Sequence, residues 1–330
     1  MTLTTIIWRN HPVQAAIAAA VALAYGVPAQ AFEFQTENGW LGSFNNTISV
    51  GASWRAEGPN RKLFSAGDGN RIGELGGMGG SNTSSGTLNW DKGDRFTTPF
   101  KLLSELSLKK GDMGAFLRAK AWYDQALNDE KVRVGNGDNG HKANSKLSDS
   151  SQPRLNKFDG IELLDAYVYN TFQVGDNPLQ LRAGRQVVNW GESLFIQGLN
   201  QLNPLDVPAL RRPGTEVKEA MLPVWSLYGN LGLGNGVSVE GFYQFKWEPS
   251  VFDTCGLYWS PVEWGMSAST GSARCRQVVT SAGLVGNVAA YNGGLFIPQV
   301  KGKEGSDSGQ YGVALRLPLK AIDAEMGFFA

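Results

Sequence analysis

The sequence is short of charge and of metal-binding side chains. Of its 330 residues 18% are charged, acidic and basic residues are equal in number, and there are only two cysteines and two histidines. A balanced charge, without a basic patch that alternates with aromatic residues, excludes a nucleic-acid partner. Soft-metal sites need several Cys or His ligands, so we expect no metal and no cofactor. Low charge together with 42 glycines is also unusual for a cytosolic enzyme.

Long apolar runs are also missing, with one exception at the N-terminus. Arg9 is followed by VQAAIAAAVALAYGV, which is shorter than the roughly twenty residues that a membrane helix needs. Ala29-Gln30-Ala31 then supplies the small residues of a cleavage site. We therefore expect residues 1–31 to be a cleavable signal peptide and the mature chain to be exported. The alternative is an uncleaved anchor helix.

Cysteine is so scarce that only one pairing exists. In an exported chain, a lone pair such as Cys255 and Cys275 predicts a disulfide that closes a loop. A metal site is the competing interpretation. It lacks ligands, because the only histidine of the mature chain, His141, is far away in the sequence.

What the sequence does contain is a recurring alternation of apolar and polar residues. In GVSVEGFYQFKWEP (236–249) the odd positions are apolar apart from the glycine, and most even ones are polar. A period of two over about twelve residues indicates a β-strand, long enough to cross a bilayer at a tilt. A further segment begins near Ala324, and seven others share the pattern: Ser43–Arg55, Phe100–Lys109, Met113–Asp124, Ile161–Phe172, Leu179–Trp190, Val224–Gly232 and Gln310–Leu319.

The connections between these segments alternate in length. Tight turns such as Lys109–Asp112 and Gly175–Pro178 are rich in Gly, Asp, Asn and Pro. Transmembrane barrels combine short periplasmic turns with long external loops, and they close the sheet so that no backbone edge meets lipid. We therefore predict an all-β fold, an antiparallel transmembrane outer-membrane β-barrel over residues 32–330. Its external loops would be residues 56–96, 125–160, 191–223 and 249–308.

The number of strands suggests an incomplete barrel. About nine strands are present, whereas single-chain bacterial barrels have an even number. The sequence also stops inside a strand, at Phe329-Ala330. We expect these residues to be the N-terminal part of a larger barrel.

Alternation also assigns each strand residue to lipid or to the lumen. Tyr243 and Phe245 are expected to face lipid, and Lys246 the lumen. Arg185 lies on the lipid side of its strand, which predicts a bulge near Gly184 or a position that protein covers. Strand parity and the inward loop described next predict these residues of the lumen and its constriction: Arg118, Lys120, Asp165, Arg182, Gln186, Asp206, Arg211, Arg212, Glu216 and Glu240.

The connection 191–223 is unusually apolar for an external loop, because it combines Phe195, Ile196 and Leu199 with charged residues. Exposure to water would waste that apolar surface. We predict that this loop folds into the barrel as a plug or constriction. Asn203-Pro204 would turn the chain, and Asp206, Arg211 and Arg212 would meet charges of the lumen. A structural loop that braces the barrel rim is the alternative.

The loop from Phe252 to Cys275, which the predicted disulfide closes, is rich in aromatic residues. Aromatic residues on an external loop that a disulfide holds in place could bind apolar ligands. Packing over the barrel mouth is the simpler interpretation. The candidate ligand-contacting residues are Phe252, Tyr258, Trp259 and Trp264.

Four stretches between Leu164 and Glu219 carry a resemblance: LDAYVY (164–169), RAGRQVVNWGES (182–193), NQLNPLD (200–206) and LRRPGTE (210–216). They resemble the proteobacterial outer-membrane family called domain of unknown function thirteen-oh-two. The resemblance implies a longer barrel in the outer membrane of a Gram-negative bacterium. It also implies an envelope pathway for hydrophobic compounds, with a periplasmic lipid-carrier-like protein and an inner-membrane efflux-type transporter as partners. It brings no catalytic motif.

Enzymatic interpretations find little support. Ser107-Leu108-Lys109-Lys110 matches S-x-x-K, but the companion motifs are absent. A serine hydrolase would have to use His141, which we expect in a flexible loop without a structured partner.

We therefore expect a non-enzymatic component that contacts outer-membrane lipid and passes a small, mostly hydrophobic solute. The inward-facing parity includes Leu103, Leu163, Tyr167, Tyr169 and Phe242, which favours a path of low polarity. The alternatives are a general polar porin and an outer-membrane hydrolase.

Overall fold

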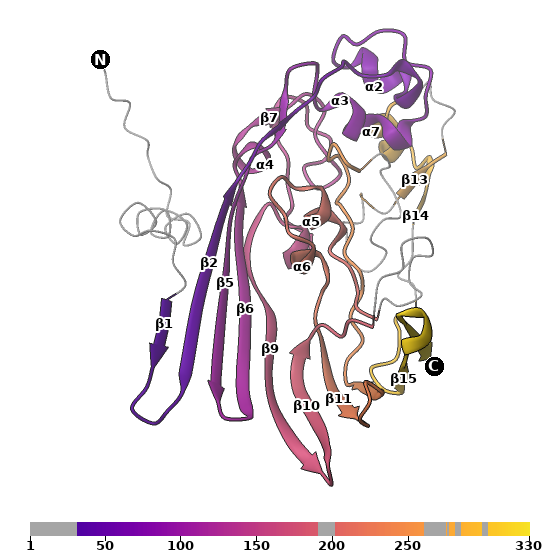
Figure 1. The fold of residues 1–330 in the computed structure, drawn as a ribbon. Helices are drawn as coiled ribbons and strands as arrows, with labels where there is room; N and C mark the ends of the chain where they lie inside the picture. Colours follow the sequence, from indigo (N-terminus) through magenta and orange to yellow (C-terminus); the bar gives the residue numbers. More distant parts are fainter. Residues whose placement is uncertain (1–31, 191–201, 261–274, 276, 281–284, 299–302) are drawn as a thin grey trace, which may run out of the picture.

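The computed structural model describes residues 32–190, 202–260, 275, 277–280, 285–298 and 303–330. Within them, ten strands form one antiparallel sheet in chain order (Figure 1). The all-β, antiparallel fold is thus confirmed. The strands are β1 (Phe32–Gln35), β2 (Leu41–Val50), β5 (Pro99–Lys110), β6 (Met113–Asp124), β9 (Asp159–Val174), β10 (Asn177–Gln186), β11 (Val224–Gly232), β12 (Ser238–Gln244), β15 (Gln310–Leu319) and β16 (Ala324–Phe329).

Two strands differ from the prediction. β1 was missed because its four residues, FEFQ, are too few to display an alternation, and it pairs with the start of β2. β12 is shorter than the alternating stretch 236–249, since it ends at Gln244. Lys246 therefore lies past the strand, 57% exposed and 3.0 Å from Glu248, and not in the lumen position expected for it.

Short and long connections alternate along the sheet, as predicted. The short turns lie at one end and the long connections at the other (Figure 1). Gly111 and Gly175 occupy tight turns with φ of 60° and 64°, a region that favours glycine. The sheet does not close on itself, and β1 and β16 form its two edges.

The long connections contain short helices and small two-stranded sheets. No helix among the described residues is both long enough and apolar enough to span a membrane. The helices are η1 (Arg61–Leu63), α2 (Ala66–Asn70), η2 (Ser81–Thr83), α3 (Ser84–Leu88), α4 (Gln125–Asp129), η3 (Arg154–Asn156), α5 (Val207–Arg211), α6 (Val217–Ala220) and α7 (Asn287–Asn292), with η5 (Lys320–Ile322) in a short turn. The small sheets pair β3 (Ser53–Trp54) with β4 (Arg95–Thr97), β7 (Lys131–Val132) with β8 (Ser145–Lys146), and β13 (Gln277–Val279) with β14 (Phe296–Pro298).

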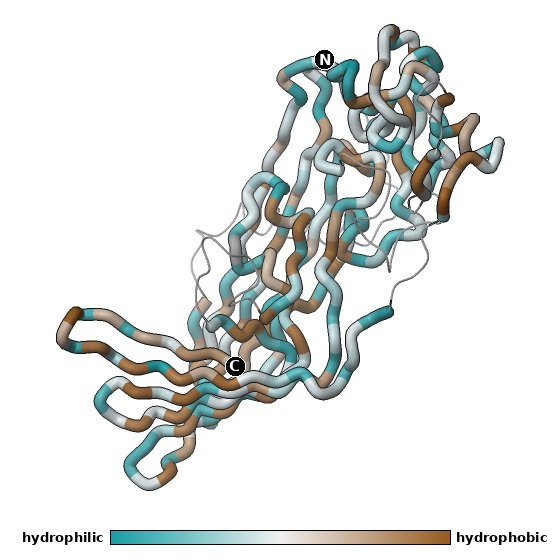
Figure 2. The backbone as a smooth tube through the Cα atoms, turned by 90° about the vertical axis from the view of Figure 1, so that its right-hand side faces the viewer, coloured by the Kyte–Doolittle hydropathy of each residue, from teal (hydrophilic) through white to brown (hydrophobic). Residues whose placement is uncertain are grey.

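The two faces of the sheet have opposite polarity. We call the face against which α5 and α6 lie the inner face, and the other one the outer face (Figure 1). On the inner face Lys120, Asp165 and Glu240 are only 4% to 6% exposed. Hydrophobic and hydrophilic residues alternate along the hairpins, as the brown and teal segments of Figure 2 show. A row of register partners crosses the outer face at Val168, Ala183, Leu227, Tyr243 and Tyr311, and its four large side chains are 39% to 72% exposed.

A β-bulge in β9 changes which residues face inward. Leu117 pairs with Ala166, but Ala119 pairs with Leu163, so β9 has one residue more than β6 over this interval. The consecutive residues Leu164 and Asp165 are both buried, at 0% and 4% exposure. Leu163 is 44% exposed on the outer face. Its expected place inside is therefore wrong, because the bulge shifts the parity of this part of β9.

The side chain of Arg185 contacts β9 next to the same bulge. The register of β10 runs through Gly184 without interruption, so the irregularity lies in the neighbouring strand. Arg185 Nη1 is 3.0 Å from Glu162 Oε1 and donates to the Leu163 carbonyl at 2.6 Å. Its side chain is only 17% exposed. Arg185 is thus at a position that protein covers.

Apolar residues of the long connections form their own core beyond the sheet. Cys255 and Cys275 lie close enough for a disulfide, with 5.5 Å between their Cα atoms, which agrees with the predicted pairing. Clusters of buried apolar residues hold the connections together, and the largest consists of Trp90, Phe96, Leu127, Val132, Leu147, Phe158 and Leu257.

Gly184 is the strand glycine whose replacement we expect to matter most. Its φ is +135°, and a Cβ there would lie 2.3 Å from the Ala166 carbonyl oxygen. Gly184→Ala should lower the free energy of unfolding by about 1–3 kcal/mol. At Gly241 the nearest atom would be 3.6 Å away, so Gly241→Ala is a matched control with a change below about 1 kcal/mol. Denaturant midpoints of the purified variants measure both, and equal midpoints would contradict the assigned strain.

Candidate functional site

A folded segment covers the inner face of the sheet, and we call residues 202–222 the inner segment. Asn203 holds its base, since Asn203 Oδ1 accepts from the Val188 N–H at 2.9 Å and Nδ2 donates to the Leu222 carbonyl at 2.9 Å. Leu205 and Met221 form an antiparallel bridge between the two ends. The segment is therefore a closed loop with its own hydrogen bonds.

Two short helices give the inner segment its shape. Asp206 caps α5, because its Oδ1 accepts from the Ala209 N–H at 3.1 Å. Glu219 of α6 reaches back and accepts from the Glu216 N–H at 3.0 Å. Both carboxylates retain a second oxygen or lone pair for a partner outside the segment.

Buried lysines of the sheet provide those partners. Lys120 of β6 is 2.6 Å from Asp206 Oδ2, and Lys101 of β5 is 2.8 Å from Glu219 Oε1. All four side chains are at most 8% exposed. The inner segment is thus attached to the sheet by two buried ion pairs.

Arg118 is the centre of a third set of charges. Its Nε is 2.8 Å from Glu105 Oε1, and its Nη1 is 3.2 Å from Asp165 Oδ2. Lys218 of α6 is 3.2 Å from Glu105 Oε2 and 3.2 Å from Glu216. Arg118, Asp165 and Glu216, predicted as constriction residues, are therefore linked across the sheet and the inner segment.

Arg182 of β10 lies between the inner segment and the short turns. Its guanidinium carbon is 4.1 Å from the ring centroid of Tyr228 and 5.7 Å from that of Tyr167. The Tyr228 hydroxyl donates to Glu240 Oε2 at 2.8 Å, and Arg316 Nε donates to Glu240 Oε1 at 2.8 Å. Glu240 is thus paired with Arg316 rather than with Arg182.

Three predicted residues make other contacts. Arg211 reaches a loop and not the sheet, since its Nη1 is 2.5 Å from Asp253 and donates to the Trp259 carbonyl at 2.8 Å. Burial raises the pKa of the Asp253 carboxyl, although Arg211 and Arg212 act in the opposite direction. Gln186 is fully buried and donates to the Ser226 carbonyl at 3.0 Å. Arg212 lines a small recess beside Asp253.

Several residues that take part in these contacts are not among the constriction residues predicted from the sequence. Lys101 and Glu105 have the inner parity of their strand, so the alternation contained the signal for them. Lys218 and Glu219 have no such signal, because a short helix within a loop reveals its orientation only after folding. Tyr228 was missed because a tyrosine in an alternating strand suits either face.

The sequence of the chain matches a known protein family. A family model described as "Protein of unknown function (DUF1302)" matches residues 13–330. The chain belongs to this family. The match covers the whole described sheet and the inner segment, and it is the family that the four sequence stretches resemble. Searches of curated proteins and of solved structures found no match.

In the described part of the aromatic loop of this DUF1302 chain, up to Ser260, the aromatic rings pack against one another and against neighbouring connections. Tyr258 stacks on Phe96 at a centroid distance of 3.9 Å and contacts Trp90 edge-on. Trp259 is 43% exposed, and its ring also packs edge-on against those of Phe96 and Tyr258. The Phe252 carbonyl accepts from Asn156, and Trp264 lies outside the described residues.

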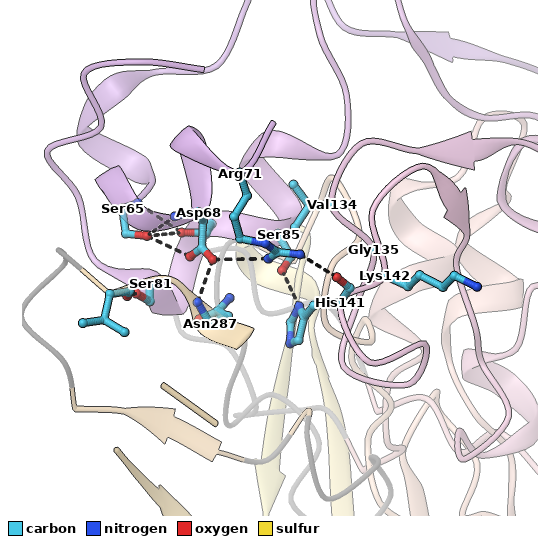
Figure 3. A network of polar contacts seen from close by, with 12 residues as sticks. Ser65, Asp68, Arg71, Ser81, Ser85, Val134, Gly135, His141, Lys142 and Asn287 are labelled. Carbon is cyan, nitrogen blue, oxygen red and sulfur yellow. Dashed lines mark hydrogen bonds and ion pairs between the residues drawn. The ribbon is translucent and has the colours of Figure 1, made fainter. Parts of the chain in front are cut away.

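His141 is held in a network of polar contacts, contrary to the flexible loop expected (Figure 3). Its Nδ1 is 3.1 Å from Ser85 Oγ, and Arg71 donates to its carbonyl at 2.8 Å. Asp68 accepts from Ser65 Oγ at 2.8 Å, and burial raises the pKa of its carboxyl. Ser85 and His141 are at most 1% exposed, so a substrate cannot reach the serine hydroxyl in this conformation. The network joins the long connections to one another.

The described residues of this DUF1302 chain hold no group of three or more His, Cys, Asp or Glu side chains that is placed to bind a metal ion. The charged inner face is the candidate functional site because buried ion pairs and a cation over aromatic rings gather on it. Its chemistry is that of ion pairs and aromatic rings.

We predict that Lys120→Met lowers the free energy of unfolding by about 3–5 kcal/mol, since it leaves the Asp206 carboxylate buried without its cation. Lys120→Met combined with Asp206→Asn should recover at least half of this loss, because asparagine can still cap α5. Lys246→Met is the matched control at an exposed pair, with a change below about 1 kcal/mol. Chemical denaturation measures all three. If Lys120→Met and Lys246→Met behave alike, the ion pair does not hold the inner segment.

Proposed function

We propose that this DUF1302 chain forms a wall of an outer-membrane β-barrel that passes a small, mostly hydrophobic solute. One observation carries the proposal, namely that a row of apolar side chains is exposed on the outer face, whereas Lys101, Lys120 and Asp165 are buried on the inner face. A protein surrounded by water has the opposite arrangement. Contiguous exposed apolar surface on this scale indicates an interaction with lipid or with another protein.

The lengths of strands and connections support lipid as the neighbour. β5 and β6 have 12 residues each and β9 has 16, which exceeds the roughly 9–11 residues that a tilted strand needs to cross a bilayer. The short turns would lie on the periplasmic side and the long connections outside. The cysteine pair and the buried network around His141 would then belong to the external part.

The inner segment would act as the constriction of this barrel. It lies on the inner face, and its carboxylates are paired with Lys101 and Lys120. Passage would be passive at this component, with selectivity set by the inner segment and the residues of the inner face. Energy would come from envelope partners, and family resemblance suggests a periplasmic lipid-carrier-like protein and an inner-membrane efflux-type transporter.

The choice of a hydrophobic solute rests on the aromatic part of the inner face. Tyr167 packs against Phe116, with ring centroids 5.6 Å apart, and lies 6.4 Å from the ring of Tyr169. Phe242 packs edge-on against Trp190 at 5.1 Å. A general polar porin remains the second candidate, favoured by the many charges of the inner face. Those charges are mostly paired with one another, whereas a wide porin has a wet lumen.

Fractionation of the native cells is the experiment that tests the proposal. The outer-membrane fraction is run on a denaturing gel, unheated and boiled, and detected with an antibody to this chain. A folded barrel resists the detergent and migrates differently before boiling. A soluble protein without such a shift would show that something other than lipid covers the outer face.

We predict that an arginine on the outer face destabilises the protein only if that face contacts lipid. Val168, in the middle part of β9, is 58% exposed, and Leu75 in a long connection is 68% exposed. In lipid, Val168→Arg should cost about 2–4 kcal/mol, measured as the loss of the heat-modifiable form. Leu75→Arg is the control, with a change within about 0.5 kcal/mol. A neutral effect of Val168→Arg would place this face in water.

The solute class predicts the outcome of two permeability assays. Cells that make the protein should exchange a hydrophobic dye, N-phenyl-1-naphthylamine, several-fold faster than cells that lack it. Liposomes with the purified native protein should not swell in small sugars, because the inner segment obstructs the path. Rapid swelling without dye exchange would favour the polar porin.

A further inference from the structure

We propose that Arg182, with the rings of Tyr167 and Tyr228, forms a binding subsite for the anionic group of an otherwise apolar solute. This inference rests on the proposed passage of a hydrophobic solute and adds a charge requirement to it. A carboxylate and a phosphate ester offer a guanidinium the same oxygen acceptors, in the same bidentate geometry. The ligand class is thus an amphiphile with one small anionic head.

Arg182 differs from the other cations of the inner face. Lys101, Lys120, Arg118 and Arg316 each lie within 3.2 Å of a carboxylate oxygen. No described carboxylate forms an ion pair with Arg182, whose guanidinium lies over two aromatic rings and also interacts with the Tyr167 hydroxyl.

The carboxylates near Arg182 are already engaged. Glu240 accepts from both Tyr228 and Arg316, and Asp165 is paired with Arg118. Glu325, further along the sheet, also accepts from Arg316. The position of Arg182 therefore has an uncompensated positive charge that an anionic solute can neutralise.

The environment of Arg182 makes this charge costly without a ligand. Its Nε is buried and has no hydrogen-bond partner in the described structure. The attraction of a cation to an aromatic ring offsets only part of the desolvation of this half-buried guanidinium. An anion that accepts from the guanidinium would supply the missing interaction.

The surroundings fit the apolar body of such a solute. Tyr169, the register partner of Arg182 on β9, lies over Gly114, where a Cβ would come within 2.5 Å of its ring. Phe116 and Tyr167 continue this aromatic surface. A solute that has passed the inner segment would meet these rings next, with its anionic head at Arg182.

Binding of three ten-carbon probes to the purified native protein tests the subsite. Decanoate, decyl phosphate and decanol have the same chain and differ in the head group, and calorimetric titration in neutral detergent gives each affinity. For the wild type we expect at least one anion to bind about tenfold or more tightly than decanol. Arg182→Met should remove this difference and leave decanol binding unchanged, whereas Arg182→Lys should retain part of it. Arg154→Met, at an arginine that is 67% exposed on a connection, is the matched control and should retain all of it.

The outcomes separate the two proposals. Equal affinity of the wild type for all three probes would overturn the subsite and leave the hydrophobic path intact. Binding of none of them would overturn both. A head-group preference that survives Arg182→Met would overturn the subsite, and Arg182 would then have only a structural role between two tyrosines. If Arg182→Met does not fold, the wild-type preference and its reduction in Arg182→Lys decide. Preference for decyl phosphate alone, or decanoate alone, would support the subsite and identify the head group.

Discussion

The burial of charge on one face of the sheet is the constraint on which the rest of the structure depends. Lys101 and Lys120 are at most 8% exposed, and a buried cation is costly unless an anion reaches it. Asp206 and Glu219 reach these lysines from the inner segment. This requirement accounts for the fold of the inner segment. Its two helices and the bridge at its base place those carboxylates beside the amino groups of the lysines.

The apolar character of the outer face follows from the same separation of charged and apolar side chains. Each strand alternates, so a strand that presents charge inward must present its remaining side chains outward. The row through Val168 and Leu227 is apolar and exposed across several strands. A sheet of this kind is stable only where something apolar covers that face, which is why lipid enters the proposed function. The aromatic surface around Arg182 is a local exception on the inner face, since its cation is held by rings instead of carboxylates.

Much of this arrangement could be predicted from periodicity. The bounds of β6, β11 and β15 coincide with the alternating stretches, because long strands with one polar face give the strongest signal. The prediction failed where an extra residue or a short element intervened. The bulge at Leu164 and Asp165 reversed the parity of Leu163, and nothing in the local pattern marks an unpaired residue. Arg211 was placed near the lumen wall, but the direction of α5 turns it toward Asp253.

By itself the sequence determined the strand type, the sorting of short and long connections, the polarity of the two faces and the single pairing available to cysteine. These features depend on residues close together in the chain, or on there being only two cysteines. Only the tertiary structure decided which cation meets which carboxylate, why Arg182 has none, and how His141 is enclosed by Ser85 and Arg71. Ion pairs such as Lys120 with Asp206 join residues far apart in the chain. Their choice depends on strand register and helix direction, which local patterns do not encode.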